Sequence, residues 1–149
     1  EEDARASLRE AVQRHPSNGE GWLELGRLEL NTNHPELAEA AFSQVLRINP
    51  SDREALFAMA QALERQGKKA DAERVRNRQI QVEKDLKATR DAAQKIRENP
   101  KDPAPRVEIA GLMLQNGLIQ EGGRWLQSAL DLDPNHPGAR QMANKFGLR

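Results

Sequence analysis

The sequence has no cysteine and no tyrosine, and aromatic residues make up only 3% of it. Without cysteine the chain can form no disulfide, no thiol nucleophile and no thiolate ligand for a metal. It also has no apolar run as long as a membrane-spanning helix requires, so no membrane contact is expected. The lack of cysteine is compatible with the cytoplasm and with the bacterial periplasm, which leaves the localisation unknown.

Hydrophobic residues account for 37% of the 149 residues and charged residues for 31%, with a formal net charge of zero. Thin layers of paired helices tolerate this balance, because each layer has much surface and little depth. The charges are unevenly spread, since the first third of the chain is acidic and the middle is basic. Such a distribution can steer association with another protein or with a second copy.

Four prolines mark a repeat along the chain. Pro16, Pro50, Pro100 and Pro134 each follow a polar residue, and the intervals between them are 34, 50 and 34 residues. A period of 34 residues is typical of a helix–turn–helix repeat. The longer middle interval therefore predicts one repeat with an insertion.

The stretches between these prolines predict helices, and no stretch alternates strictly enough to predict a strand. Ser17 with Glu20, and Ser51 with Glu54, have the spacing of capping boxes at helix starts. The predicted helices cover residues 2–14, 19–31, 35–47, 52–66, 68–98, 103–116, 119–131 and 136–146. The fifth contains no glycine or proline, and we expect one helix of about 30 residues, on the order of 45 Å long.

The clearest repeat runs from Gly19 to Asp52. It contains Trp22-x-x-Leu25-Gly26, then Ala38-x-x-x-Phe42-x-x-Val45, then Pro50. This order of Trp, Leu-Gly, Ala, aromatic and Pro closely resembles the tetratricopeptide repeat (TPR). The resemblance implies an all-α fold, a superhelix of helical hairpins or α-solenoid, here with one lengthened helix in the middle.

We expect a single TPR-like domain over residues 1–149. Its parts are the second helix of a truncated repeat (1–18), a repeat (19–52), a repeat with an elongated second helix (53–101), a repeat (102–135) and a C-terminal capping helix (136–149). Because Glu1 opens inside half a repeat, a longer parent protein is expected. The style of the repeats resembles bacterial TPR proteins, some of which serve envelope assembly or cytochrome maturation.

In a superhelix of this family the first helix of each pair lines the concave face. The resemblance places on this predicted groove Leu23, Arg27, Leu30, Phe57, Gln61, Glu64, Val107 and Leu114. Apolar side chains among polar ones suit an extended or helical peptide. The competing interpretation is that Leu23, Phe57 and Val107 only pack against neighbouring helices. A clamp for a C-terminal carboxylate is disfavoured, because only Arg27 is basic at the positions that form it in other family members.

A second predicted surface lies on the long helix. Residues from Ala72 to Ile96 recur at alternating spacings of three and four, a heptad pattern that the polar Gln79 and Thr89 weaken. This self-association seam comprises Val75, Val82, Leu86, Ala93 and Ile96. It predicts a homodimer or a domain swap, and packing within one chain is the alternative.

The other function classes find less support. A nucleic-acid or acidic-polymer binder could use the basic middle, but no aromatic residue lies between Phe57 and Trp125 to stack on bases. His15, His34 and His136 each precede a proline in separate turns, so we expect neither a metal site nor a cofactor. No spacing of serine, histidine and acid predicts a catalytic residue. The sequence thus predicts a non-enzymatic scaffold for a protein or peptide partner, or else a regulatory module of a larger enzyme.

Overall fold

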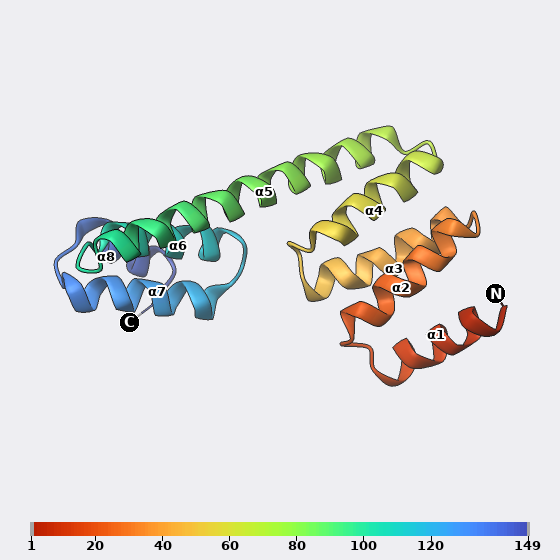
Figure 1. Ribbon diagram of the computed structural model, residues 1–149, viewed down its shortest axis with the longest axis horizontal. Coiled ribbons are helices and arrows are strands. Elements are labelled where there is room, and N and C mark those ends of the chain that lie inside the picture. The colour runs from red at the N-terminus through yellow and green to blue at the C-terminus, as the bar shows by residue number, and fades with distance from the viewer. Residues whose placement is uncertain (1, 149) are drawn as a thin grey trace. The chain divides into compact units, whose positions relative to one another are not determined.

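The computed structural model describes residues 2–148, and every regular element in that range is an α-helix. The helices are α1 (Glu2–Arg14), α2 (Gly19–Asn31), α3 (Pro35–Ile48), α4 (Arg53–Arg65), α5 (Lys69–Glu98), α6 (Ala104–Gln115), α7 (Ile119–Leu132) and α8 (Pro137–Lys145) (Figure 1). Each end lies within one residue of its predicted position. The predicted long helix is α5, which has 30 residues.

The N-cap residues of α2 and α4 each lie one position after the serine that the capping-box pattern predicts. The side chain of Asn18, not Ser17, accepts hydrogen bonds from the backbone N–H groups of Glu20 and Gly21. Before α4 the capping residue is Asp52, whose Oδ1 lies 2.9 Å from the backbone nitrogen of Ala55. Asparagine, aspartate and serine are about equally favourable N-cap residues. The sequence pattern alone therefore did not distinguish Asn18 from Ser17, or Asp52 from Ser51.

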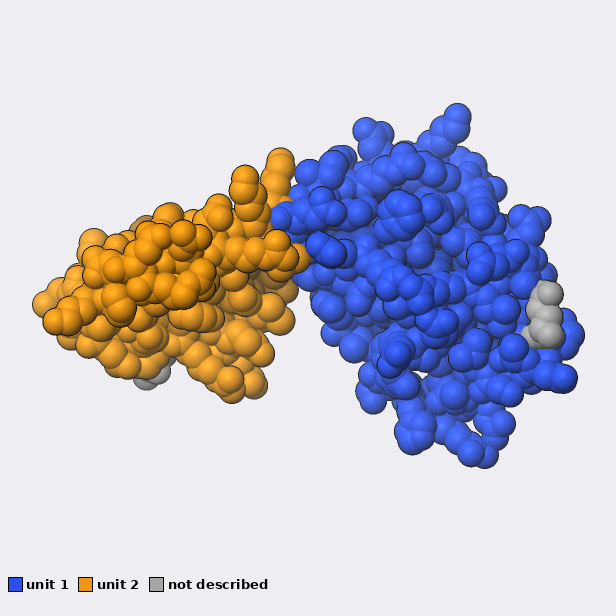
Figure 2. Space-filling model, in the orientation of Figure 1, with its two compact units in different colours: residues 1–83 blue, residues 84–149 orange. Residues whose placement is uncertain are grey.

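The contacts divide the chain into two compact units, residues 1–83 and 84–149, and the division falls inside α5 (Figure 2). In the first unit, α4 runs beside the beginning of α5 (Figure 1), where Arg76 forms an ion pair with Glu64. In the second unit, the end of α5 pairs with α6 through Lys95 and Glu108, whose Nζ and Oε2 atoms are 3.2 Å apart. Each unit therefore uses its own part of α5.

Two apolar clusters form the core of the first unit. Trp22 packs against one made of Val12, Leu25 and Ala41, which joins α1 to α2 and α3. Phe42 belongs to the other, which joins α2 and α3 to α4. Trp22 and Phe42 thus fill two different layers, as expected of a stacked repeat. Gly26 allows the tight packing of α2 on α3, because a Cβ atom there would lie 2.4 Å from the Phe42 ring.

The second unit has a separate core on α6, α7 and α8. Its buried members are Ala110, Leu114, Leu126, Ala129 and Ala139. Trp125, Met142 and Phe146 are among the partly buried side chains that pack against this cluster. Gly122 plays the part of Gly26 here, because its added Cβ would come within 2.5 Å of the Leu114 side chain.

Candidate functional site

The first helices of the first unit's repeats, α2 and α4, carry six of the predicted groove residues: Leu23, Arg27, Leu30, Phe57, Gln61 and Glu64. On α4, Glu54, Phe57, Gln61 and Glu64 follow one another at spacings of three and four, so they share one face of the helix. Phe57 is 54% exposed, which is unusual for a large aromatic side chain. An exposed aromatic ring among polar groups has the composition of a binding hot spot.

Charged contacts tie this face to its neighbours. Arg27 of α2 forms ion pairs with Glu24 on its own helix and with Glu54 on α4. At the other end of α4, Glu64 is held by Arg76 of α5. These exposed pairs contribute little stability.

The apolar groove residues differ in how far they reach the surface. Leu23 packs beside Met59 against the core cluster and is partly buried. Leu30 is only 5% exposed and belongs to that core, so its side chain does not reach a ligand. Of the predicted groove residues in the first unit, Phe57 is therefore the exposed apolar one, and Leu23, Arg27 and Gln61 are half-buried.

The groove residues predicted in the second unit, Val107 and Leu114, lie on α6. Val107 packs against the core of that unit, and Leu114, 3% exposed, is part of it. Leu114 therefore serves packing, as Leu30 does. An open hollow of about 260 Å³ lies beside them, lined by Gly111, Gln115, Gln141, Met142, Lys145 and Phe146.

The predicted self-association seam is largely covered within the chain. Val82 is 2% exposed, and Val75, Ala93 and Ile96 are partly buried. Leu86 is the exposed member of the set. Burial of the central valine within one chain leaves little apolar surface there for a second copy.

A buried ion cluster between α1 and α2 was not predicted. The carboxylate of Glu29 is almost inaccessible and accepts hydrogen bonds from Arg5 Nε at 3.1 Å and Arg9 Nη2 at 3.0 Å. The Nδ1 atom of His34 lies 3.6 Å from the same carboxylate, and Arg5 also contacts Thr32. Arg5 and Glu29 are 24 residues apart, and no local pattern signals such a pairing.

The carboxylate of Glu39 on α3 has a lowered pKa. Hydrogen bonding to Lys68 Nζ, 2.8 Å away, lowers the pKa of Glu39 below its ordinary value. Partial burial acts in the opposite direction, and a hydrogen bond from Gln66 adds to the lowering. This trio connects α3 to the turn before α5, outside the face of Phe57.

The remaining observations concern metals and membranes. Within residues 2–148, no cluster of histidine and acidic residues has the arrangement of a metal site. His136 instead caps α8, its Nδ1 accepting the backbone N–H of Ala139 at 3.2 Å. No helix in the described part of the chain has both the length and the apolar content needed to cross a membrane.

Comparison with known proteins agrees with the fold. The structure resembles a crystal structure of MamA (TM-score 0.51, 14% identity, 97% of this chain and 78% of that chain covered). It also resembles a MamA variant, the RS-1 ArsTM double mutant (TM-score 0.50, 18% identity, 99% and 74% covered). A third similar structure is YrrB, described as a TPR protein with an unusual peptide-binding site (TM-score 0.46, 13% identity, 95% and 84% covered).

The likeness to the two MamA structures and the layered hairpins confirm the predicted all-α helical-repeat fold, and the match to a TPR family profile makes it a module of the TPR type, which serves protein–protein interaction. The family profile of the cytochrome c-type biogenesis protein H TPR domain matches residues 2–92, more than half of the chain. The chain belongs to that family. No curated protein matches its sequence.

Proposed function

We propose that this chain is a non-catalytic module that binds a polypeptide handled during c-type cytochrome biogenesis, on the face of α2 and α4 around Phe57. The observation that carries the proposal is the exposed Phe57 ring inside the segment that matches the family profile. Membership of the family suggests the process, c-type cytochrome biogenesis. The side chains of the face suggest what kind of polypeptide binds there.

The face suits a peptide with one apolar anchor between polar residues. Phe57 offers the apolar contact, and the amide of Gln61 one helical turn away can hydrogen-bond a peptide backbone. Arg27 and Glu54 place both charge signs beside the ring, so a partner with mixed charges fits better than one with a single sign. Cytochrome precursors and other maturation proteins are the polypeptides that such a module would meet.

The experiment that tests this proposal compares two exposed apolar positions. The Phe57→Ala protein should bind a purified cytochrome precursor or maturation protein at least tenfold more weakly than the unaltered chain, the loss typical of a hot-spot aromatic. Leu132→Ala is the matched control, because Leu132 is also exposed but lies on α7 in the other unit. Equal binding by the Phe57→Ala protein in a titration would remove the α2–α4 face from the proposal.

Self-association through α5 is the second candidate, and the exposed Leu86 is the observation that favours it. Light scattering at high micromolar concentration tests it directly. A dimer that becomes a monomer in the Leu86→Glu variant would support the seam. A monomer in the unaltered protein would exclude it, and the covered Val82 makes this the result we expect.

A further inference from the structure

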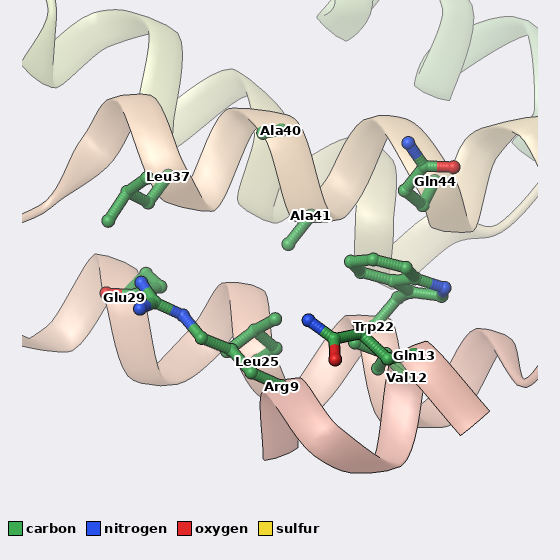
Figure 3. Close-up of a pocket in the computed structure, with 10 residues that line it drawn as sticks. All are labelled: Arg9, Val12, Gln13, Trp22, Leu25, Glu29, Leu37, Ala40, Ala41 and Gln44. Carbon is green, nitrogen blue, oxygen red and sulfur yellow. Dashed lines mark hydrogen bonds and ion pairs between the residues drawn. The ribbon is translucent and has the colours of Figure 1, made fainter. Parts of the chain in front are cut away.

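A concave surface lies on the first unit, on the stripe of α2 that carries Trp22, Leu25 and Glu29 (Figure 3). These residues are not the ones that face α4, since Leu23 and Arg27 occupy a different side of the helix. We propose that this groove between α1 and α3 binds a peptide segment that carries one apolar side chain and one carboxylate. It is a site separate from the face of Phe57.

The floor of the groove is apolar and has room for a side chain. Val12 of α1, Leu25 of α2 and Ala41 of α3 form a buried base on which Trp22 packs. Leu37 stands at the rim and is 44% exposed. The volume of about 310 Å³ is too small for a packed helix but ample for one or two apolar side chains of a peptide.

One end of the groove carries two guanidinium groups beside a buried carboxylate. Glu29 forms ion pairs with both Arg5 and Arg9. Arg5 has a second carboxylate partner in Glu2, whereas Glu29 is the only carboxylate that pairs with Arg9 among the described residues. Arg9 is about half exposed and lines the groove beside Glu29 (Figure 3).

This arrangement prepares Arg9 for an anionic ligand. The bond from Arg9 Nη2 to Glu29 fixes the guanidinium, and its other N–H groups have no partner among the described residues. A guanidinium held in this way can donate two parallel hydrogen bonds to an incoming carboxylate. The charge complementarity therefore selects an acidic group over a neutral or basic one.

The other end of the groove is polar without being charged. The amides of Gln13 on α1 and Gln44 on α3 lie near the Trp22 ring, on the two sides of the groove (Figure 3). Neither amide has a hydrogen-bond partner within residues 2–148. Each amide can both donate a hydrogen bond to a peptide backbone and accept one from it. A simple anion or a lipid tail does not offer both a donor and an acceptor. The combination of apolar floor, amides and Arg9 thus specifies a peptide.

The probes that test this site are acetylated, C-terminally amidated hexapeptides with one leucine and one aspartate at varied spacing. Their matched controls carry asparagine in place of aspartate. Titration into the ¹⁵N-labelled chain should shift the indole N–H of Trp22 and the side-chain amides of Gln13 and Gln44. The aspartate peptides should bind several-fold more tightly than the asparagine peptides, because only they carry a charge for Arg9.

Variants at Ala40 separate this groove from the other face. Ala40 is exposed and lines the groove, so a longer side chain there need not disturb the core. Ala40→Glu should weaken the aspartate peptides and Ala40→Lys should strengthen them, each by roughly two- to fivefold, the effect of a partly screened charge. Phe57→Ala should leave both affinities unchanged.

Three results would overturn the inference. They are the absence of shifts at millimolar peptide, equal affinity for aspartate and asparagine peptides, and shifts confined to the residues around Phe57. The last of these would support the proposed face on α2 and α4 while excluding the groove. Failure of the groove is therefore distinguishable from failure of that face.

Discussion

Gly122 and Gly123 on α7 are adjacent glycines that differ in how closely neighbouring atoms approach them, so replacing each by alanine tests the packing of α7. Gly122 and Gly123 both lie inside a regular helix, and replacing either by alanine should improve helix propensity by about 1 kcal/mol. A Cβ atom on Gly122 would come within 2.5 and 2.8 Å of two carbons of Leu114 and within 3.2 Å of the backbone oxygen of Ala110. On Gly123 the nearest atoms belong to Leu148, at 3.8 Å, which is ordinary contact.

The expected free energies follow from these distances. Overpacking a filled core usually lowers the free energy of unfolding by about 1–3 kcal/mol, and the upper end applies because Leu114 is buried and the Ala110 carbonyl is backbone. Subtracting the gain in helix propensity leaves Gly122→Ala about 2 kcal/mol less stable than the unaltered chain. Gly123→Ala should be more stable by up to about 1 kcal/mol, since it adds no close contact.

Urea unfolding measures both variants, followed by circular dichroism and by the fluorescence of Trp125, which packs in the same core. The two substitutions should shift the midpoint in opposite directions, with a difference of about 3 kcal/mol between them. If Gly122→Ala is as stable as Gly123→Ala, then Leu114 moves freely and the close approach of α6 and α7 is not what requires glycine.

Three further changes probe the first unit. Glu29→Gln should lower the free energy of unfolding by about 3 kcal/mol in urea titrations, because the two arginines lose their buried counter-charge; a change below half that value would contradict this. Asp52→Ala should cost about 1 kcal/mol of stability through loss of the cap on α4, and an unchanged midpoint would show that the cap is not needed. Lys68→Met should raise the pKa of Glu39, which an NMR titration measures. Since the folded-state pKa is depressed, Glu39 stabilises the fold above its unfolded-state pKa, and this contribution disappears as the pH falls through the folded-state pKa. The variant should therefore lose less stability on acidification, and an unaltered acid transition would contradict this.

The helices could be predicted from the sequence because their ends are set by local chemistry. Pro35 and Pro137 start helices, Gly67 and Gly117 follow helix ends with positive φ angles, and the absence of both residue types over α5 predicts its length. The capping residues were misplaced by one position, since Asn18 stands beside Ser17 and both can accept the same hydrogen bonds. Local sequence rules locate the start of a helix, but they do not show which of two neighbouring residues is the N-cap.

The candidate site was harder to predict, because both sides of a first helix in this fold carry apolar residues. The resemblance to the family places Leu23, Leu30 and Phe57 on the same predicted face, but only the packing decides how deep each side chain lies. Leu30 is buried and Phe57 is exposed, although both belong to the same predicted face. The groove on α1 and α3 was missed for a related reason, since its walls come from three helices whose mutual distances no local pattern contains.

The buried ion cluster suggests why α1 meets α2 in one register. Breaking a buried ion pair is costly, but replacing both partners with apolar residues is often neutral or stabilising. We therefore expect Arg5→Met combined with Glu29→Leu to lose far less free energy of unfolding than Glu29→Gln alone. Arg9, which is half exposed, stays solvated when its partner is gone. In the double variant Arg9 is no longer fixed, so the preference of the groove for aspartate peptides should fall even though the fold persists. If the double variant is as unstable in urea unfolding as Glu29→Gln, then the ion cluster stabilises the fold and does more than set the register of α1 against α2.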